Sequence, residues 1–272
     1  MAVGVALSLS GLQMQTLFRN PLAGPFVLGI SSGASFGVAI LVMGSSILPL
    51  SLGHVSIAFA ASLGSVTVLL VILALAKKLK DSTSLLIIGL MFGSAVTAGV
   101  SILQYFGNPE EVQGYLFWTF GSLSGVTWTE LRILLPVTIV GFLFTLVLSK
   151  PMNVVLLGDD YATSSGISLT QIRLLLILCT SLLAGISTAF CGPIAFVGIA
   201  VPHIARLTFN TSNLSQLAPI VAIMGAGIMI VCDLITQLPG FAIVIPINAV
   251  TSLFGAPLII WLIIRRKKMV AF

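Results

Sequence analysis

The chain has 272 residues, of which 58% are hydrophobic and 7% are charged, and its net charge is +5. Soluble domains carry about a quarter charged residues, so this composition excludes a soluble enzyme or binding module. Apolar runs long enough to cross about 30 Å of hydrocarbon recur from end to end, which predicts one helical membrane domain over residues 1–272. Strands of a membrane barrel would instead alternate polar and apolar residues over about ten positions, and these runs do not alternate.

Nine of these apolar runs are predicted to be membrane-spanning helices. They lie at roughly 2–18, 26–44, 55–76, 84–106, 131–149, 172–190, 193–207, 217–235 and 243–264.

The basic residues orient these spans. Groups of them follow every second span and contain Arg19, then Lys77, Lys78 and Lys80, then Lys150 and Arg173, then Arg206, and finally Arg265, Arg266, Lys267 and Lys268. Because cytoplasmic loops of membrane proteins are enriched in lysine and arginine, we expect all these groups and the C-terminus on the cytoplasmic side. The first span then starts outside, which predicts a parent architecture of ten spans with one more before residue 1.

Glycines recur at helical spacing in two predicted spans. Gly29, Gly33 and Gly37 share one face of the second span, and Gly89 and Gly93 share a face of the fourth. Such stripes let helices approach closely in lipid, where no hydrophobic force draws helices together. We expect these glycines to mediate helix packing or to line a path whose walls can shift.

Two similar segments predict an internal repeat of inverted orientation. GPFVLGI at 24–30 enters the membrane from the inside, whereas GPIAFVGI at 192–199, which begins with Gly192 and Pro193, enters from the outside. Inverted repeats are common among transporters. A Gly-Pro pair before an apolar run is also an ordinary helix start, which leaves the simpler interpretation open.

Aromatic residues mark the outer loop 107–130. Tyr105, Tyr115, Trp118 and Trp128 cluster there, and amphipathic rings of this kind lie at headgroup depth. The sequence GYLFWTFGSLSG within this loop is too short and interrupted to span the membrane. It is therefore predicted to contain an interfacial helix.

The sequence LLGDDYATSSGIS at 156–168 is a short polar segment between two apolar runs. An aspartate at the bilayer centre costs about 2.5–3.5 kcal/mol on insertion scales, so Asp159 and Asp160 are expected outside the hydrocarbon. The basic residues place them on the cytoplasmic side. Acids at the start and Gly166 at the end are typical of a short helix, whose dipole favours negative charge at its N-terminus.

This short helix is a candidate docking element. Ser168 and Gln171 predict a capping box that opens the next span, so the helix would be joined closely to spans on both sides. The chain has no GxxxxGK[ST] phosphate loop and cannot bind ATP in that manner. A separate ATPase could dock on the helix; a solvated turn whose acids only cap a helix is the alternative.

Four segments resemble motifs of the FecCD/BtuC-like permeases, the membrane subunits of type II ABC importers for iron siderophores, haem and cobalamin. They are the polar segment 156–168, LFRNPLAGPFVLGISSGASFG at 17–37, GPIAFVGIAVPHIARL at 192–207 and PINAVTSLFGAPLIIWLI at 246–263. The resemblance extends in the same order over nearly the whole chain. It implies an all-α, BtuC-like bundle with about nine transmembrane helices here, where the family has ten, and with short coupling and interfacial helices.

The resemblance also implies partners. The chain would be a transport subunit rather than an enzyme, would bind no cofactor or metal itself, and would leave ATP and magnesium to a cytoplasmic ATP-binding subunit. It would pair with a second copy of itself, with a periplasmic or lipoprotein substrate-binding protein and with lipid of a bacterial cytoplasmic membrane, and not with nucleic acid.

Candidate site residues fall into three further groups beside the glycines. Those expected to couple to the ATPase are Gly158, Asp159, Asp160, Tyr161, Ala162 and Gly166; those at the cytoplasmic interface or gate are Arg19, Asn20, Pro21, Pro202, His203 and Arg206; and those that meet the binding protein, or else form a solvated rim, are Glu110, Glu111, Glu130 and Arg132.

Two departures from the family pattern leave the cargo open. Members often carry an arginine shortly after the aspartate that matches Asp233, where this chain has Gln237. Many also carry a glutamate ahead of the proline that matches Pro246, where this chain has Val244 and Ile245. Both positions lie toward the outer rim, so neither the contacts there nor the choice among siderophore, haem and cobalamin follows from the resemblance.

A secondary transporter driven by protons or ions is the rival function. His203, Arg206 and Asp233 are its candidate relay, because ionisable groups in or beside membrane spans are often functional. The first two are expected at the cytoplasmic end and Asp233 near the outer end, and the run 217–232 between them offers no polar stepping stones.

A serine hydrolase and a metal or disulfide protein are poorer alternatives. GISSG at 29–33 matches GxSxG, but it lies in a predicted membrane helix without aspartate and histidine partners. Cys179, Cys191 and Cys232 are widely spaced in or beside apolar runs, so we expect small core residues rather than ligands or disulfides.

Overall fold

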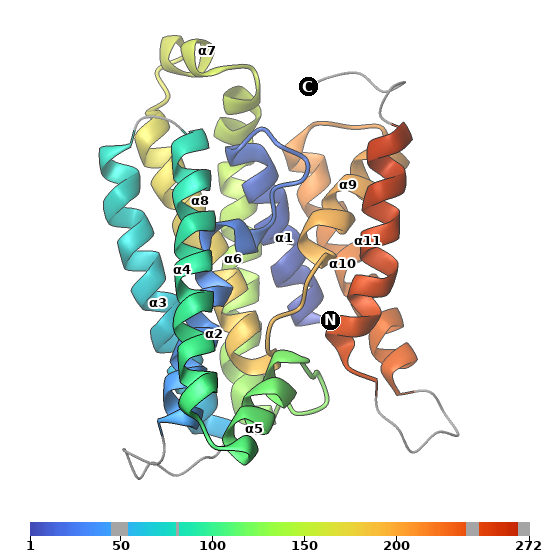
Figure 1. Ribbon diagram of the computed structural model, residues 1–272. Helices are drawn as coiled ribbons and strands as arrows, with labels where there is room; N and C mark the ends of the chain where they lie inside the picture. The colour runs from blue at the N-terminus through green and yellow to red at the C-terminus, as the bar shows by residue number, and fades with distance from the viewer. Residues whose placement is uncertain (45–53, 80–81, 238–244, 266–272) are drawn as a thin grey trace.

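The computed structural model describes residues 1–44, 54–79, 82–237 and 245–265. These residues form eleven α-helices and one short 3-10 helix, and no strand occurs among them. Most helices run along a common axis, with the short α7 (Asp159–Ser164) at one end and α5 (Pro109–Thr119) at the other (Figure 1). The prediction of an all-α membrane fold is confirmed.

Five helices are long and apolar enough to cross a membrane. They are α3 (His54–Lys78), α4 (Ser82–Phe106), α6 (Trp128–Leu156), α8 (Leu169–Cys191) and α10 (Leu214–Thr236). The other four predicted spans contain the shorter helices α1 (Ala2–Leu17), α2 (Ile30–Met43), α9 (Val197–Phe209) and α11 (Ile247–Arg265). Each of the nine predicted spans therefore contains an α-helix, and those at 26–44 and 193–207 are helical over only part of their length.

Two of the predicted spans are interrupted by backbone that is not α-helical. The span at 26–44 begins with the 3-10 helix η1 (Pro25–Leu28), which ends where Gly29 adopts a left-handed conformation with φ of +74°. The span at 193–207 becomes helical only at Val197, after Phe196, whose φ is +68°. From these breaks α2 runs toward the α5 end and α9 toward the α7 end (Figure 1), as an inverted repeat requires.

The basic residues gather at the α7 end of the bundle. Helices α1, α3, α6, α9 and α11 end there, and α4, α8 and α10 begin there (Figure 1). Lys77 lies in the last turn of α3 and Arg206 in the last turn of α9. This arrangement agrees with the predicted orientation, in which one end of the bundle carries most of the positive charge. The basic residues at 80 and 266–268 lie outside the described residues.

Helix α1 forms the centre of the bundle and packs against α6, α8, α9 and α10. Even its polar side chains are buried, among them Ser8, Gln13 and Gln15. The Gln13 amide donates to Thr145 Oγ1 on α6 at 2.7 Å, and its oxygen accepts from Thr180 Oγ1 on α8 at 2.7 Å. A side-chain amide without partners is costly in hydrocarbon, so these bonds require α1 to lie inside protein.

Glycines let the neighbouring helices reach α1. A Cβ atom at Gly11 would overlap the carbonyl of Gly198 on α9, and one at Gly4 would overlap the carbonyl of Gly225 on α10. These contacts are between backbones, which cannot move aside as a flexible side chain can. The central packing therefore depends on the absence of side chains at these four positions.

We predict that Gly11→Ala destabilises the bundle by about 1–3 kcal/mol or more, because the new methyl group must push α9 away from α1. The measurement is the thermal midpoint of the protein in detergent, followed by helical circular dichroism. Gly227→Ala is the matched control, since a Cβ atom there meets no atom within 4 Å. Equal midpoints for the two variants would contradict the packing described.

Candidate coupling and translocation site

The short helix α7 projects beyond the other helices at the basic end of the bundle (Figure 1). It follows α6 across Gly158, whose φ is +126°, and Asp159 and Asp160 form its first turn. Both acids are exposed there, and Tyr161 is 55% exposed. The helix N-terminus favours these negative charges. The helix therefore presents two carboxylates and a phenol to the outside.

The end of α7 is fixed by a Schellman motif. Gly166 has a φ of +78° and donates its N–H to the carbonyl of Thr163 at 3.0 Å, while Ile167 donates to Ala162 at 3.0 Å. This pairing satisfies carbonyls that would otherwise end the helix without partners. The methyl group of Ala162 is buried, so the inner face of α7 rests on the bundle while the outer face stays exposed.

Arg19 links the centre of the bundle to α7. It follows α1 with a φ of +46°, the left-handed conformation that glycine usually supplies at this position. From there its Nε donates to the carbonyl of Val155 near the end of α6 at 3.0 Å, and its guanidinium forms an ion pair with Asp159. One side chain thus joins α1, α6 and α7.

The residues after Arg19 form a compact turn. Asn20 donates its N–H to Gln15 at 3.1 Å, and its side-chain oxygen accepts from the N–H of Leu22 at 3.0 Å. Pro21 is buried. Asn20 and Pro21 therefore define how the chain turns from α1 into the extended segment before η1.

Arg173 lies in the first turns of α8 beside this link. Its side chain is 7% exposed and donates to the carbonyl of Leu79 at the end of α3 at 3.0 Å. A cavity of about 240 Å³ separates it from Arg19 and Asp159. The sequence indicated only that Arg173 faces the cytoplasm, whereas the structure shows that it also joins α8 to α3.

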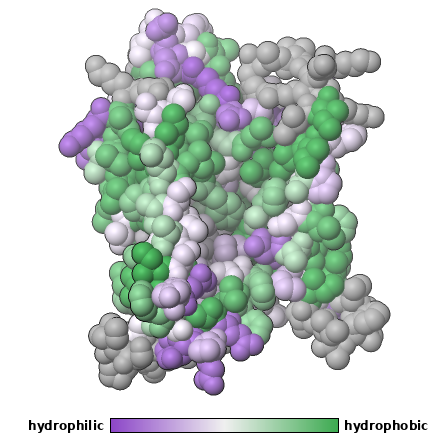
Figure 2. All heavy atoms as spheres, viewed as in Figure 1, coloured by the Kyte–Doolittle hydropathy of each residue, from purple (hydrophilic) through white to green (hydrophobic). Residues whose placement is uncertain are grey.

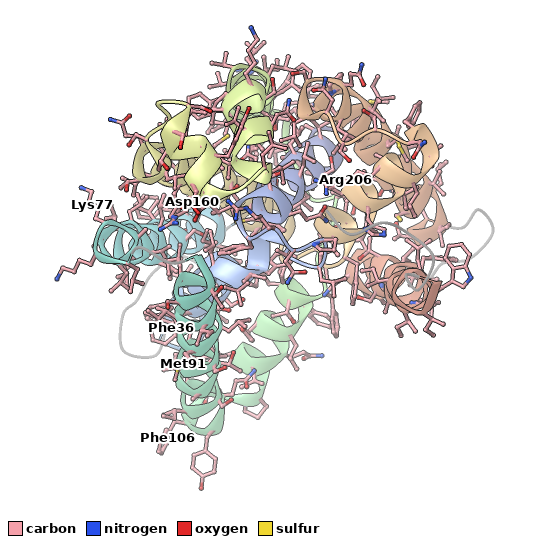
Figure 3. The ribbon with its side chains drawn as sticks, turned by 90° about the horizontal axis from the view of Figure 1, so that it is seen from above. Phe36, Lys77, Met91, Phe106, Asp160 and Arg206 are labelled. Carbon is pink, nitrogen blue, oxygen red and sulfur yellow. The ribbon has the colours of Figure 1, made fainter. Side chains whose placement is uncertain are left out.

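The candidate gate residues of α9 lie at the same end of the bundle. Pro202 is inside α9 and buried, so this helix continues past it. His203 is half-buried, one turn from Arg206. The guanidinium of Arg206 is buried, and Figure 3 places this residue among the helices, whereas Lys77 lies at the rim.

The acidic residues of the outer end divide into two kinds. Glu110 is exposed in the first turn of α5. Glu130 is only 8% exposed, because its carboxylate accepts from the N–H and the hydroxyl of Thr127 at 2.7 and 3.0 Å in a capping box of α6. Glu111 similarly accepts from the N–H of Asn108, at 3.2 Å, in a capping box of α5. Arg132 is exposed.

The starts of α5 and α8 differ from the sequence predictions. The interfacial helix predicted within the outer loop is confirmed as α5, although it begins earlier, at Pro109, because Asn108 caps it there. The capping box predicted at Ser168 is wrong: the Ser168 side chain makes no capping hydrogen bond, although α8 begins at the next residue. The sequence analysis missed the two capping boxes that do form, which read N-P-E-E and T-W-T-E.

The glycine stripe of α2 lies against α3 and α4. Cβ atoms at Gly33 and Gly37 would overlap the backbone of α3 at Gly64 and Ala60, and one at Gly29 would lie 3.2 Å from the carbonyl of Gly89 on α4. Beside this contact runs an apolar groove of about 760 Å³ between α2, α3 and α4.

Gly192 and Pro193 lead from α8 into the second broken segment. Gly192 has a φ of +73°, and a Cβ atom there would contact the backbone of Trp118 and Gly121. Asn248 accepts from the N–H of Ala195 at 3.1 Å through its side chain. Extended backbone at membrane depth is thus surrounded by protein, as the absence of water from lipid requires.

A less hydrophobic band crosses the face that contains both breaks. Figure 2 shows pale and purple atoms along the middle of this face, between two strongly hydrophobic flanks. The flanks correspond to the α3–α4 side and the α10–α11 side in Figure 1.

Cys179, Cys191 and Cys232 are buried free thiols, so their predicted role as core residues is confirmed.

Known proteins are similar to this chain in sequence and fold. Residues 1–265 match the FecCD transport family. The vitamin B12 import system permease protein BtuC of Citrobacter koseri is 34% identical over 267 residues, which cover 98% of this chain and 79% of that protein. The Salmonella arizonae protein of the same name is 35% identical over 271 residues, with 98% and 79% coverage.

A solved structure has a similar fold. It is described as an inward-facing conformation of a metal-chelate type ABC transporter, is 28% identical, and superposes with a TM-score of 0.88 over 97% of this chain and 83% of its own. The chain therefore belongs to the FecCD transport family and is a membrane permease of the ABC transporter class.

Proposed function

We propose that the chain is the permease subunit of a binding-protein-dependent importer that carries a metal chelate, namely an iron siderophore, haem or cobalamin, across a bacterial cytoplasmic membrane. The α7 end faces the cytoplasm, together with the C-terminus, and binds an ATPase. The α5 end faces outward and receives the binding protein. The observation that carries this proposal is the exposed acidic helix α7, joined to the central helix α1 through Arg19.

Coupling in this proposal depends on a stiff path from α7 to the breaks. A distant site can move these helices only through an element whose equilibrium both sites bias. Displacement of α7 acts on α6 and α8, to which it is joined on either side, and on α1 through Arg19. Helix α1 contacts α9 at Gly198, just after the second break. Movement at the ATPase can thus reach the middle of the membrane.

A second copy of the chain is proposed to cover α4 and α11. Helix α4 is the least buried of the five long apolar helices. Met91 and Phe106 on this helix are 67% and 80% exposed, and Figure 3 shows α4 protruding from the bundle. Large apolar side chains of α11, including Leu253 and Phe254, are exposed as well. Two copies facing each other across these helices would enclose the less hydrophobic band between them.

We predict that the double variant Asp159→Lys, Asp160→Lys loses the ATPase, because both exposed carboxylates of α7 reverse their charge. The measurement is the amount of ATPase that co-purifies with the solubilised permease, expected to fall at least about tenfold, together with ATP-driven uptake. Glu110→Lys, a single charge reversal at the opposite end, is the control for ATPase retention. Full ATPase retention by the α7 variant would refute docking at α7, and uptake by a wild-type permease with no ATPase bound would favour a secondary transporter.

We predict that Arg19→Gly keeps the ATPase but lowers the amount of cargo carried per ATP hydrolysed. Glycine adopts the left-handed conformation readily, so α1 still ends correctly, while the contacts to Val155 and Asp159 disappear. The measurement is uptake and hydrolysis in the same proteoliposomes. The ratio of cargo imported to ATP hydrolysed should fall about threefold or more, because two polar contacts are lost. Arg19→Lys, which keeps the charge, should retain more of the ratio. An unchanged ratio in Arg19→Gly would exclude this link.

We predict that Glu110→Lys slows association with the binding protein in a salt-dependent way, because exposed charges at a rim act mainly on the association rate. The difference from wild type should be about threefold at low salt and should shrink near physiological salt, where screening acts over roughly 8 Å. Surface plasmon resonance with the captured permease measures the association rate at both salt concentrations. The α7 double variant serves as control. If wild type and Glu110→Lys have the same association rate at every salt concentration, Glu110 belongs to a solvated rim and does not contact the binding protein.

A further inference from the structure

A cavity of about 290 Å³ lies next to the two broken segments. Its walls come from α2, α4, α5, the start of α11 and the extended segment before α9. Phe26 of η1 and Ala195 of that extended segment both contribute to it, which places it close to both breaks. Its polar lining residues are Ser31, Ser32, Ser35, Thr97, Tyr115 and Asn248.

The two sides of α2 differ in chemistry. Ser31, Ser32 and Ser35 line this cavity, whereas Gly33 and Gly37 line the apolar groove against α3. The groove is about 760 Å³, lined largely by apolar and small residues, as expected of a surface that meets lipid or another apolar helix. Helix packing accounts for the glycine side. It does not account for a row of hydroxyl groups on the other side, because packing in lipid needs small residues but not a cavity between them.

Several of the polar groups are held in place by neighbours. Ser31 Oγ pairs with Thr188 Oγ1 at 3.0 Å, Thr97 Oγ1 donates to the carbonyl of Gly93 at 2.9 Å, and Asn248 accepts from Ala195. The phenol of Tyr115 interacts with the hydroxyl of Ser35, and burial raises the pKa of Tyr115, so this residue stays neutral.

The lining chemistry excludes charged ligands of two kinds. Protein sites for magnesium, calcium and transition metals usually include carboxylate, imidazole or thiolate ligands, and the lining contains none of these. It also contains no lysine or arginine that would neutralise an anionic group. What it offers is hydroxyl groups and one amide, which both donate and accept hydrogen bonds. The complementary ligand is a neutral group rich in carbonyl, amide or hydroxyl functions.

The volume decides how much of the cargo enters. Pockets that enclose a drug-sized molecule measure roughly 300–1,000 Å³, so about 290 Å³ holds a side group and not a whole metal chelate. The face around it carries the less hydrophobic band of Figure 2. Thr97 is exposed on α4, so the cavity opens beside that helix.

We infer that this cavity is a hydrogen-bonding subsite in the wall of the translocation path, which binds neutral amide or hydroxyl side groups of a metal chelate as the cargo passes the breaks. The inference rests on the proposed function and specifies it further: the cargo carries neutral polar groups at its periphery. The subsite holds the cargo transiently because a few neutral hydrogen bonds are individually weak.

The test is the triple variant Ser35→Ala, Thr97→Val, Tyr115→Phe, which removes three hydroxyl groups with little change of shape. The intact complex with its ATPase and binding protein is reconstituted in proteoliposomes, and initial uptake of cyanocobalamin and of a neutral ferric trihydroxamate is measured over a range of cargo concentrations. We expect uptake of the transported chelate to fall about tenfold, with ATPase co-purification and basal hydrolysis unchanged. Thr67→Val in the apolar groove is the control, since its hydroxyl bonds only to Leu63 of its own helix.

The single exchange Thr97→Val keeps the experiment decisive if the triple variant folds poorly, because Thr97 is exposed and valine has the same shape. It should lower uptake about threefold, and Thr97→Ser, which restores a hydroxyl, should recover most of it. Wild-type uptake by a folded triple variant, or by Thr97→Val, overturns the subsite while the proposed function stands. Import of haem, measured in the same assay, but of neither neutral chelate would overturn the subsite alone. Failure of the wild-type complex to import any of the three with ATP overturns the proposed function, and the subsite with it.

Discussion

The bundle depends on the requirement that α1 be surrounded by protein. Gln13 lies in the middle of this helix, and lipid offers its amide no partner, so α6 and α8 must supply Thr145 and Thr180 at hydrogen-bond distance. These bonds fix the heights of three helices relative to one another. On the opposite side, Gly11 brings the backbone of α9 into direct contact. A helix held by side-chain hydrogen bonds on one side and by backbone contact on the other cannot shift without moving its neighbours.

The broken segments follow from the same requirement. Extended backbone at membrane depth exposes N–H and C=O groups, which are tolerated only where protein or water satisfies them. Gln15 of α1 donates to the carbonyl of Ile199 at 3.1 Å, and Asn248 accepts from the N–H of Ala195 at 3.1 Å. The centre of the bundle therefore stabilises the second break directly. A movement of α1 that changes the Gln15 bond changes the contact to α9 directly after the second break.

Sequence alone predicted much of this fold and less of the site. Hydrophobic runs located the long helices, basic residues indicated which helix ends lie together, and Gly166 marked the end of α7, because each of these features acts over a few residues. The breaks at Gly29 and Phe196 were missed, since apolar runs continue through them and only three-dimensional contacts interrupt the helix. The central place of α1 was missed too, although Gln13 and Gln15 in an apolar run indicate burial in protein. Which partners they bind depends on residues more than 130 positions away.

The conformation of Arg19 is not explained by the stability of its ion pair. A residue other than glycine in the left-handed region costs about 1–2 kcal/mol, whereas a solvent-exposed ion pair contributes about 0–1 kcal/mol. Arg19 and Asp159 have side chains that are 36% and 55% exposed, so their pair belongs to the weak kind. Glycine at position 19 would end α1 at lower cost. This ion pair therefore does not offset the cost of the conformation, and what the arginine adds is a connection from α7 to the helix that contacts α9 directly after the second break.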